Sequence, residues 1–273
     1  MFTSCFYYTQ YREKIKHNQH PAIIFWHERV MTMFKGTVLC VPRSEAIRHA
    51  ARCLHSLGIR VTEKSAPDVT HLLLPVPSFS GGDQYLAHLL TGLPDGIIVS
   101  GGNLNSPLLE GYCCVDFLRD PYYLAENAAI TADCAIDILE NKLGSGLNNS
   151  QVLIVGWGRI GKCLMFRLQR LGLTVTVAAR KSEDLAMIRA LGTRSLPIGD
   201  VPEESERFDA IMNTVPVLVL PDISVKPDAV VLELASKPGI TGPDIINARG
   251  LPGKMAPARS GNLIAETFIR LSL

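Results

Sequence analysis

The sequence predicts an α/β protein with two domains, the second a doubly wound parallel sheet, joined by a long helix. Two observations carry this prediction. From Lys35 onward, short apolar segments alternate with amphipathic helical patterns, as is typical of parallel sheets with crossover helices. One of these segments also runs directly into a glycine-rich turn that opens a helix. With 273 residues, 47% of them hydrophobic and 19% charged, the chain can bury the cores of two modest domains.

The same patterns set the expected domain boundaries. Residues 1–33 lack a clean period, and our hypothesis is that they form a tail that need not be translated in the cell, with Met31 or Met33 as the natural start. We then expect an N-terminal α/β domain over 34–125, a bridging helix over 126–144 and a second α/β domain over 145–258. A C-terminal helix over 259–273 is expected to pack back on the N-terminal domain.

In the first domain, "TVLCV" (37–41) has the composition of a buried strand. A helix is predicted over 44–58, because Ser44 can cap its start, apolar residues share one face and Gly58 can close it. Further strands are predicted over 59–63, 70–76 and 96–101, with a short helix over 83–90.

The longest helical pattern covers 122–144 and is predicted to bridge the two domains. Its apolar stripe consists of Ala132, Ala135, Ile136, Leu139 and Leu143. After the break at 144–150, a second series predicts strands over 151–155, 173–179, 209–215 and 229–235, with helices over 162–172 and 182–192. The segment 258–273 has the pattern of a final amphipathic helix.

The turn after the strand at 151–155 reads "GWGRIG" and has G-x-G-x-x-G spacing. In this context Gly156 permits the tight turn, Gly158 lets the backbone approach a pyrophosphate, and Gly161 lets the helix pack on the strand. The amides at the helix start would face the diphosphate charge. The second domain is therefore predicted to be Rossmann-like and to bind a dinucleotide, with Arg159 and Ile160 also in contact with it.

The end of the next strand carries cations where an NAD-binding chain would be expected to carry an acid for the ribose hydroxyl. Ala179 is followed by Arg180, Lys181 and Ser182. A guanidinium, an ammonium and a hydroxyl at a helix start can bind the 2′-phosphate of NADP(H), so NADP is the predicted cofactor. The alternative is that Arg180 stacks on the adenine while Lys181 is solvated.

Two later strand ends are expected beside the nicotinamide and its ribose. The first is the segment Asn213, Thr214, Val215 and Pro216, and the second is "LASKPG" (234–239), where Ala235 and Ser236 would contact the cofactor. Ordinary loop turns are the alternative for both segments.

Charge and cysteine usage argue against several other classes of protein. A formal net charge of +1 gives no overall positive charge that would favour binding to nucleic acid or to an anionic membrane. No apolar run reaches the roughly 18 residues that a membrane-spanning helix needs. The seven cysteines form no C-x-x-C pair and no zinc spacing, so we expect no metal and a reducing cytoplasm. All seven histidines precede residue 89, which argues against a 2-hydroxyacid dehydrogenase with a later acid/base histidine.

Several segments occur together in an order that resembles the family formed by the A subunit of dipicolinate synthase. They are "HLLLPVPS", "IIVSGGN", "NAAITADCAI", "VLIVGWGRIGK", "VAARKSEDLAMI", "FDAIMNTVP", "LELASKPG" and "GLPGKMAP". The likeness extends over about residues 70–273. Its tail, "GLPGKMAPARSGNLIAE", is not a general feature of dinucleotide-binding domains.

The resemblance implies a cytoplasmic NADP-dependent oxidoreductase in a branch of the lysine (diaminopimelate) pathway. Such an enzyme oxidises a dihydrodipicolinate or hydroxy-tetrahydrodipicolinate to dipicolinate, the calcium chelator of spores formed in sporulation. It further implies a small dicarboxylate substrate and, as a partner, a separate flavoprotein-like B subunit. We also expect a homo-oligomer.

Three departures from the family pattern fall on the substrate side. In place of the family's Gly-Gly-Asp turn this chain has Val41-Pro42-Arg43. In place of Thr-x-Glu-Gly it has Thr-Ala-Asp-Cys at 131–134, and in place of Pro-Gly-Gly it has Pro-Gly-Ile at 238–240. Two other interpretations therefore stay open. One is a related amino- or imino-acid dehydrogenase with a different substrate, and the other is a regulatory protein that binds NADP(H) without turnover.

A dicarboxylate substrate needs cations and hydrogen-bond donors near the nicotinamide. Lys237 and Lys254 are the catalytic candidates because they lie in loops expected there, and Asp133 or Glu233 is the candidate proton acceptor. Solvated loop lysines are the alternative. For Glu233 we expect, rather than this role, a strand-end residue turned to solvent or to a lysine. The candidate substrate-binding residues are Arg43, Pro77, Ser78, Asn127, Thr131, Pro252 and Gly253, with Arg259 as a further cation. His71 and His88 could also reach the site, with structural roles as the alternative.

Overall fold

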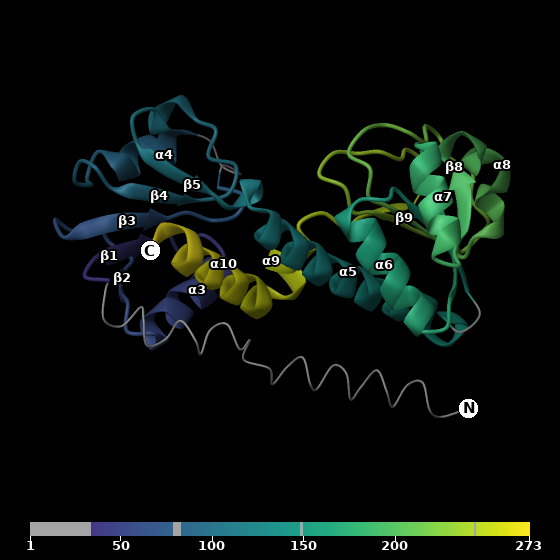
Figure 1. Cartoon of the computed structure of the whole chain (residues 1–273), viewed down its shortest axis with the longest axis horizontal. Coiled ribbons are helices and arrows are strands. Elements are labelled where there is room, and N and C mark those ends of the chain that lie inside the picture. Colours follow the sequence, from purple (N-terminus) through teal and green to yellow (C-terminus); the bar gives the residue numbers. More distant parts are fainter. Residues whose placement is uncertain (1–33, 79–82, 148–149, 243) are drawn as a thin grey trace. The chain divides into compact units, whose positions relative to one another are not determined.

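The computed structural model of the chain describes residues 34–78, 83–147, 150–242 and 244–273. The expected tail over 1–33 lies outside these ranges. The chain divides into two compact units: the first ends at Asn127 and includes Ala256–Leu273, and the second is Ala128–Met255 (Figure 1). Each unit has one sheet, and the described strands pair in parallel in both. The predicted α/β class, with two Rossmann-like domains and a long connecting helix, is confirmed.

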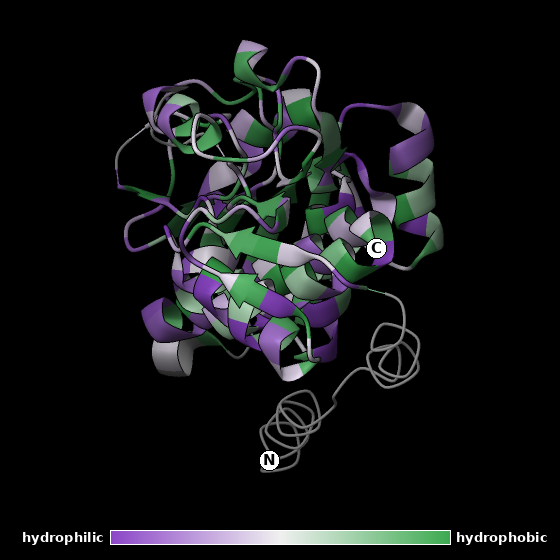
Figure 2. Cartoon of the chain, turned by 90° about the vertical axis from the view of Figure 1, so that its left-hand side faces the viewer, coloured by the Kyte–Doolittle hydropathy of each residue, from purple (hydrophilic) through white to green (hydrophobic). Residues whose placement is uncertain are grey.

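The first unit has a five-stranded sheet in the order β2-β1-β3-β4-β5. Numbered along the chain this is 2-1-3-4-5, one of the two common orders of doubly wound sheets. The strands are β1 (Thr37–Cys40), β2 (Arg60–Thr62), β3 (Val69–Leu73), β4 (Ile98–Gly101) and β5 (Cys113–Asp116), and the helices are α3 (Glu45–Ser56) and α4 (Asp83–Leu90). Figure 2 shows hydrophobic residues gathered along these strands.

Helix α3 forms as its sequence predicts. The Ser44 hydroxyl accepts a hydrogen bond from the Ile47 amide at 3.3 Å, and Gly58 takes a φ of +78° just after the helix. Ser44 therefore satisfies one of the amide groups that a helix start leaves without a partner, and Gly58 allows the left-handed turn that follows the helix. Ile47, Ala50 and Leu54 are fully buried on one face.

Helix α5 (Pro121–Leu143) is the long connecting helix. Pro121 fits its first position because a proline lacks only an amide that the helix would not use there. Four members of the expected apolar stripe, namely Ala132, Ala135, Ile136 and Leu139, are at most 1% exposed. The stripe is therefore core, as its spacing predicts.

The second unit has a six-stranded sheet in the order β11-β10-β9-β6-β7-β8. Numbered within the unit this is the Rossmann order 3-2-1-4-5-6, read from β8 to β11. The strands are β6 (Gln151–Val155), β7 (Thr174–Ala179), β8 (Arg194–Pro197), β9 (Ala210–Asn213), β10 (Val230–Glu233) and β11 (Ile245–Asn247). The helices are α6 (Arg159–Arg170), α7 (Ser182–Ala190), α8 (Val201–Glu204) and α9 (Leu251–Met255).

Three edge strands were not expected from the sequence, for physical reasons. β5 and β11 have no buried residue, β8 ends in a proline, and each lies at the edge of its sheet. Edge strands are stabilised by one neighbour and need little apolar pattern, so periodicity does not reveal them. The central strands β6 and β9, in contrast, are almost continuous buried runs.

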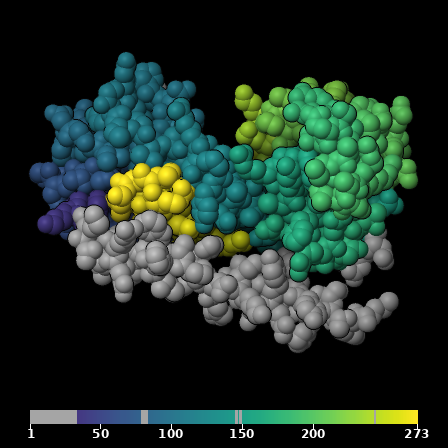
Figure 3. Space-filling model, viewed as in Figure 1, coloured from purple at the N-terminus to yellow at the C-terminus, as the bar shows by residue number. Residues whose placement is uncertain are grey.

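Helix α10 (Pro257–Ser272) belongs to the first unit although it follows the second along the chain. It packs on α3, and a Cβ on Gly261 would come within 2.4 Å of the Ala46 carbonyl oxygen. In Figure 3 its yellow atoms lie at the surface of the first unit, beside blue atoms from earlier in the chain. The two helices therefore approach closely at a position that only glycine fits.

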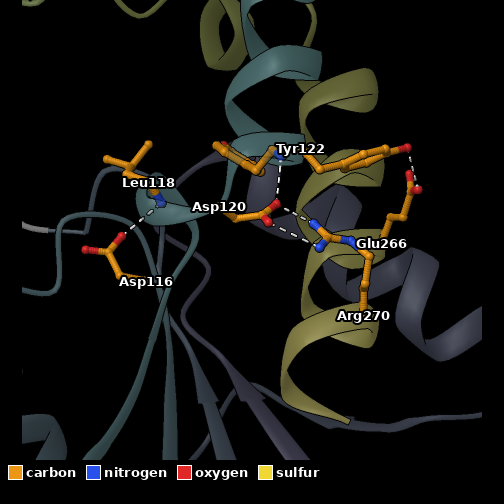
Figure 4. Close-up of polar contacts among 7 residues, drawn as sticks. Asp116, Leu118, Asp120, Tyr122, Glu266 and Arg270 are labelled. Carbon is orange, nitrogen blue, oxygen red and sulfur yellow. Dashed lines mark hydrogen bonds and ion pairs between the residues drawn. The ribbon is translucent and has the colours of Figure 1, made fainter.

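Polar contacts fix α10 to the segment that opens α5 (Figure 4). The Arg270 guanidinium donates to both oxygens of Asp120, and Tyr122 donates to Glu266 at 2.9 Å. The Arg270 hydrogen bonds hold the pKa of Asp120 below its usual value. Burial, together with Glu266, raises the pKa of Tyr122 to about 12, so this hydroxyl stays a donor at neutral pH.

Replacing Asp120 with Asn tests this anchor. Because the carboxylate loses its charge-assisted bonds to Arg270, the variant should be destabilised by about 2 kcal/mol at pH 7. Because the pKa of Asp120 is lower in the folded than in the unfolded state, its carboxylate stabilises the fold above the unfolded-state pKa, and this contribution is lost as the pH falls. The difference in unfolding free energy between variant and parent should therefore shrink below about pH 4. Urea unfolding at pH 7 and pH 3 measures both effects. The exposed Asp95→Asn is the control, and an equal effect of both variants at pH 7 would contradict the role of the ion pair.

Candidate functional site

The candidate site lies at the carboxyl edge of the second sheet, where the strand order changes direction. Strand β6 lies between β7 and β9, so the chain first crosses to one side of β6 and later to the other. Ligands of open parallel sheets bind beyond the strand ends at such a switch point, because neighbouring connections leave in opposite directions. The loops that begin at Gly156 and Thr214 flank this position.

The three glycines of the turn have different surroundings. Gly156 has a φ of +106°, and a Cβ there would come within 2.4 Å of the Thr214 hydroxyl oxygen. A Cβ on Gly161 would come within 2.2 Å of the Gly156 carbonyl oxygen, so helix and turn pack in direct contact. A Cβ on Gly158 would have no described atom within 4 Å, and Gly158 caps α6 without a side-chain hydrogen bond. The first amides of α6 are therefore available to an anion.

Hydrogen bonds tie the glycine turn to the strands on both sides. The Gly156 amide donates to the Ala178 carbonyl of β7 at 2.8 Å. The Thr214 amide and hydroxyl both donate to the Val155 carbonyl at 2.9 Å. The turn, the end of β7 and the loop after β9 therefore form one connected edge.

Arg180, Lys181 and Ser182 follow β7 directly and are all exposed. The Lys181 ammonium is 3.8 Å from one Glu183 oxygen, and the Ser182 hydroxyl is 3.5 Å from the other. A phosphate here would meet two cations and a hydroxyl at the start of α7. It would also compete with the Glu183 carboxylate for Lys181.

Glu233 is the residue whose surroundings differ most from those expected. It ends β10 and is 2% exposed, so it turns neither to solvent nor to a lysine, and that expectation is wrong. Its carboxylate accepts hydrogen bonds from the Asn213 amide group, at 2.9 and 3.0 Å, and from the backbone amides of Ala235 (2.9 Å), Gly239 (2.8 Å) and Ile240 (3.2 Å). A buried carboxylate is stable here because several N–H groups replace water around it.

The loops after β9 and β10 also pack directly on each other. A Cβ on Gly239 would come within 2.3 Å of the Val215 carbonyl oxygen and 2.4 Å of the Asn213 side chain. The Gly239 carbonyl accepts from the amides of Val219 and Leu220 at 2.9 and 3.1 Å. The two loops therefore form a single folded piece at the switch point.

The donor set at this edge fits a nicotinamide dinucleotide. The amides that open α6 have no side-chain cap among the described residues and stand where Gly158 leaves space, and cations follow the neighbouring strand. The structure places the predicted cofactor-binding residues at four neighbouring strand ends, those of β6, β7, β9 and β10. They are Gly156, Gly158, Arg159, Ile160, Gly161, Ala179, Arg180, Lys181, Ser182, Asn213, Thr214, Val215, Pro216, Ala235 and Ser236.

The three catalytic candidates have different environments. Lys237 is exposed in the loop that Glu233 anchors. Lys254 does not lie in a loop as expected but in the last turn of α9, where its ammonium donates to the Arg249 carbonyl at 2.8 Å. Asp133 accepts from the Arg167 guanidinium of α6 at 2.6 Å, so its carboxylate already has a cationic partner. Roles for these residues in turnover stay predictions.

The substrate-binding candidates are divided between the units. In the first unit Arg43 lies 3.7 Å above the Tyr85 ring. The Ser78 hydroxyl donates to the Pro75 carbonyl at 2.8 Å and accepts from the Gly102 amide. Pro77 and Asn127 also belong to the first unit, and Thr131, Pro252 and Gly253 belong to the second. Their convergence on one substrate stays a prediction.

Arg43 and Ser78 nevertheless share a position within the first sheet. They follow β1 and β3, between which the order 2-1-3-4-5 reverses, so they stand at the switch point of that sheet. His71 is buried in β3 and contacts the Ser272 carbonyl at 3.2 Å, and burial lowers its pKa. Its surroundings are those of a structural histidine.

Sequence reasoning did not find the role of Glu233 or the close packing at Gly239. The available signal was an acid at the end of an apolar strand, followed six residues later by a glycine.

Within the described chain no group of three or more His, Cys, Asp or Glu residues is placed to hold a metal ion. None of the described helices is long and apolar enough to cross a membrane.

Comparison with known proteins confirms the resemblance expected from the sequence. The chain is 32% identical over 136 residues to the A subunit of dipicolinate synthase from Bacillus subtilis, a match covering 46% of each chain. It is 28% identical over 120 residues to shikimate dehydrogenase (NADP(+)) of Methanococcus vannielii, covering 37% of this chain and 41% of the relative. The matches thus span less than half the length of these curated relatives. No family model matches the chain.

Solved structures extend the likeness in fold to most of the chain. The A subunit of dipicolinate synthase from Bacillus halodurans superposes with a TM-score of 0.73 at 21% identity, over 86% of this chain and 97% of that chain. The corresponding chain from Bacillus subtilis gives 0.70 at 21% identity, over 88% and 96%. A transhydrogenase from Sinorhizobium meliloti gives 0.63 at 16% identity, over 80% and 78%. At these identities the structures establish a shared two-domain fold.

Alanine substitutions separate the roles of the three glycine positions. Gly161→Ala should lower stability by about 1–3 kcal/mol, because its methyl group would overlap the Gly156 carbonyl. Gly158→Ala should leave stability unchanged and weaken nucleotide binding, since its methyl group enters only open space at the helix start. Thermal unfolding and ligand titration measure the two effects. Gly199→Ala, also in open space but outside the turn, should change neither, and a stable Gly161→Ala protein would contradict the packing argument.

Proposed function

We propose that this chain is an NADP(H)-dependent oxidoreductase. The observation that carries the proposal is the pairing of a dinucleotide turn with a cationic strand end at one switch point. The Gly156 amide is bonded to β7 only two residues before Arg180, so the diphosphate site and the cations are neighbours. The segments shared with the A subunit of dipicolinate synthase and with an NADP(+) shikimate dehydrogenase support this assignment.

Each part of the edge has a distinct task in this proposal. The first amides of α6 hold the diphosphate, and Arg180, Lys181 and Ser182 hold the 2′-phosphate. The loops after β9 and β10 receive the nicotinamide half. When bound, NADP⁺ supplies a hydride acceptor at C4 of its nicotinamide ring.

For the substrate we propose a dihydrodipicolinate or hydroxy-tetrahydrodipicolinate, which yields dipicolinate. The hydroxy-tetrahydro compound first loses water to give the dihydro ring. Oxidation of that ring then transfers one hydride to NADP⁺ and releases one proton, and the aromatic product favours the step. Lys237 and Lys254 would balance the carboxylate charges. A different amino- or imino-acid substrate is the second candidate, favoured by Val41-Pro42-Arg43 at the switch point of the first sheet.

A double variant tests the choice of cofactor. Arg180→Ala with Lys181→Ala should weaken NADPH binding about 100-fold, because two charge-assisted bonds to the 2′-phosphate are lost. The dissociation constant for NADH, which lacks that phosphate, should change less than about threefold. Tryptophan fluorescence follows both titrations, because Trp157 lies inside the glycine turn. Lys142→Ala removes an exposed lysine of α5 as a control, and equal losses for NADPH and NADH would contradict the assignment.

A turnover assay tests the substrate. Protein mixed with NADP⁺ and freshly generated hydroxy-tetrahydrodipicolinate should form NADPH and dipicolinate together, with or without a flavoprotein-like second subunit. Lys237→Ala should lower kcat/KM about 100-fold while NADPH binding persists, because its cation is required only for the dicarboxylate. If the protein binds NADPH tightly but forms no dipicolinate, the proposed substrate is wrong and the cofactor assignment stands.

A further inference from the structure

Glu233 accepts hydrogen bonds from the end of the neighbouring strand and from the loop that follows its own strand. Asn213, at the end of β9, donates to both of its oxygens, and three amides of the loop after β10 donate to one oxygen or the other. Among the described residues no cation contacts this carboxylate. Its hydrogen-bonding capacity is therefore filled by groups that define the path of the chain.

Asn213 extends this network into the neighbouring loop. Its side-chain oxygen accepts from the Val215 amide at 3.0 Å, and its side-chain nitrogen also donates to the Val215 carbonyl at 3.0 Å. One carboxylate and one amide side chain thus set the backbone of both loops. The tips remain exposed: Ser236 and Lys237 on one loop, and Val217 and Leu218, 56% and 58% exposed, on the other.

The network stands on one side of the switch point only. Arg180 and Lys181 follow β7, on the opposite side of β6 from β9 and β10. A dinucleotide that spans the switch point places its 2′-phosphate half beside β7 and its other half beside β9 and β10. The five hydrogen bonds of Glu233 all come from Asn213 and the loop after β10, on the nicotinamide side.

We propose that Glu233 is a positioning residue that preforms the surface for the nicotinamide half of the cofactor. It does so by holding the loops 214–219 and 235–240 as one piece, without contact to the cofactor itself. The proposal rests on the proposed NADP(H) function. It adds that the β7 side of β6 binds the 2′-phosphate half of the cofactor, whereas the side with β9 and β10 is preformed for the nicotinamide half.

A glutamine cannot replace this carboxylate. One of its two oxygens becomes an NH₂ group, and either orientation turns that donor toward backbone amides that are themselves donors. At least one buried amide then loses its acceptor. The loop after β10 should therefore loosen, while the rest of the sheet keeps its bonds.

The experiment compares Glu233→Gln with the parent in binding of NADPH and of 2′,5′-ADP, the fragment that carries only the 2′-phosphate half. NADPH binding should weaken about tenfold, as expected from one unsatisfied buried amide, while 2′,5′-ADP binding stays within about twofold. Amide exchange in the ligand-free variant should speed at Ala235, Gly239 and Ile240 but not in β6. Glu203→Gln, an exposed glutamate of α8, is the matched control and should change nothing.

A second variant keeps the test valid should Glu233→Gln fail to fold. Gly239→Ala retains the carboxylate but drives a methyl group against Val215 and Asn213, so it should give the same selective loss of NADPH binding. Equal weakening of NADPH and 2′,5′-ADP in the variants, or no weakening of either, would overturn the positioning role. A parent protein that binds neither ligand would instead overturn the proposed function, on which this inference rests.

Discussion

Backbone amides that leave the carboxyl end of a parallel strand must find acceptors, and this requirement shapes both units. In the first unit Asp116, the last residue of β5, accepts from the amides of Asn103 and Leu104. It also accepts from the amide of Leu118 (Figure 4). In the second unit Glu233, the last residue of β10, does the same for the loop that follows it. In both units an acid at the end of a strand therefore holds the loops at the sheet edge in defined paths.

These ordered loops matter because the central strands of the second sheet are buried. The central strands are apolar and buried on both faces, so chemistry is restricted to the edge where the strands end. At that edge the glycine turn opens α6, whose first amides have no side-chain cap among the described residues, and Arg180 and Lys181 follow the neighbouring strand. A chain whose formal net charge is only +1 thus presents two adjacent cations at the start of α7.

Local rules explain how much of this arrangement could be predicted. The positive φ of Gly156 and the contact between Gly161 and the Gly156 carbonyl are local requirements for glycine, so the turn could be located from the sequence. The same holds for the Ser44 cap. The burial of Glu233 depends instead on Asn213, twenty residues away on the adjacent strand, and no local pattern encodes that partner. The sequence pattern favours a loop at Lys254 because a helix as short as α9 has no periodicity to detect.

The return of α10 to the first unit has a consequence for biosynthesis. A ribosome makes β1 and α3 early but α10 only after every strand of the second unit has been synthesised. Until then the face of α3 that receives Gly261, around Ala46 and Ala50, has no covering helix. All strands of the second unit are therefore synthesised while the first unit still lacks α10 and exposes apolar surface. The nascent chain is most open to misassociation, or to chaperones, in that interval.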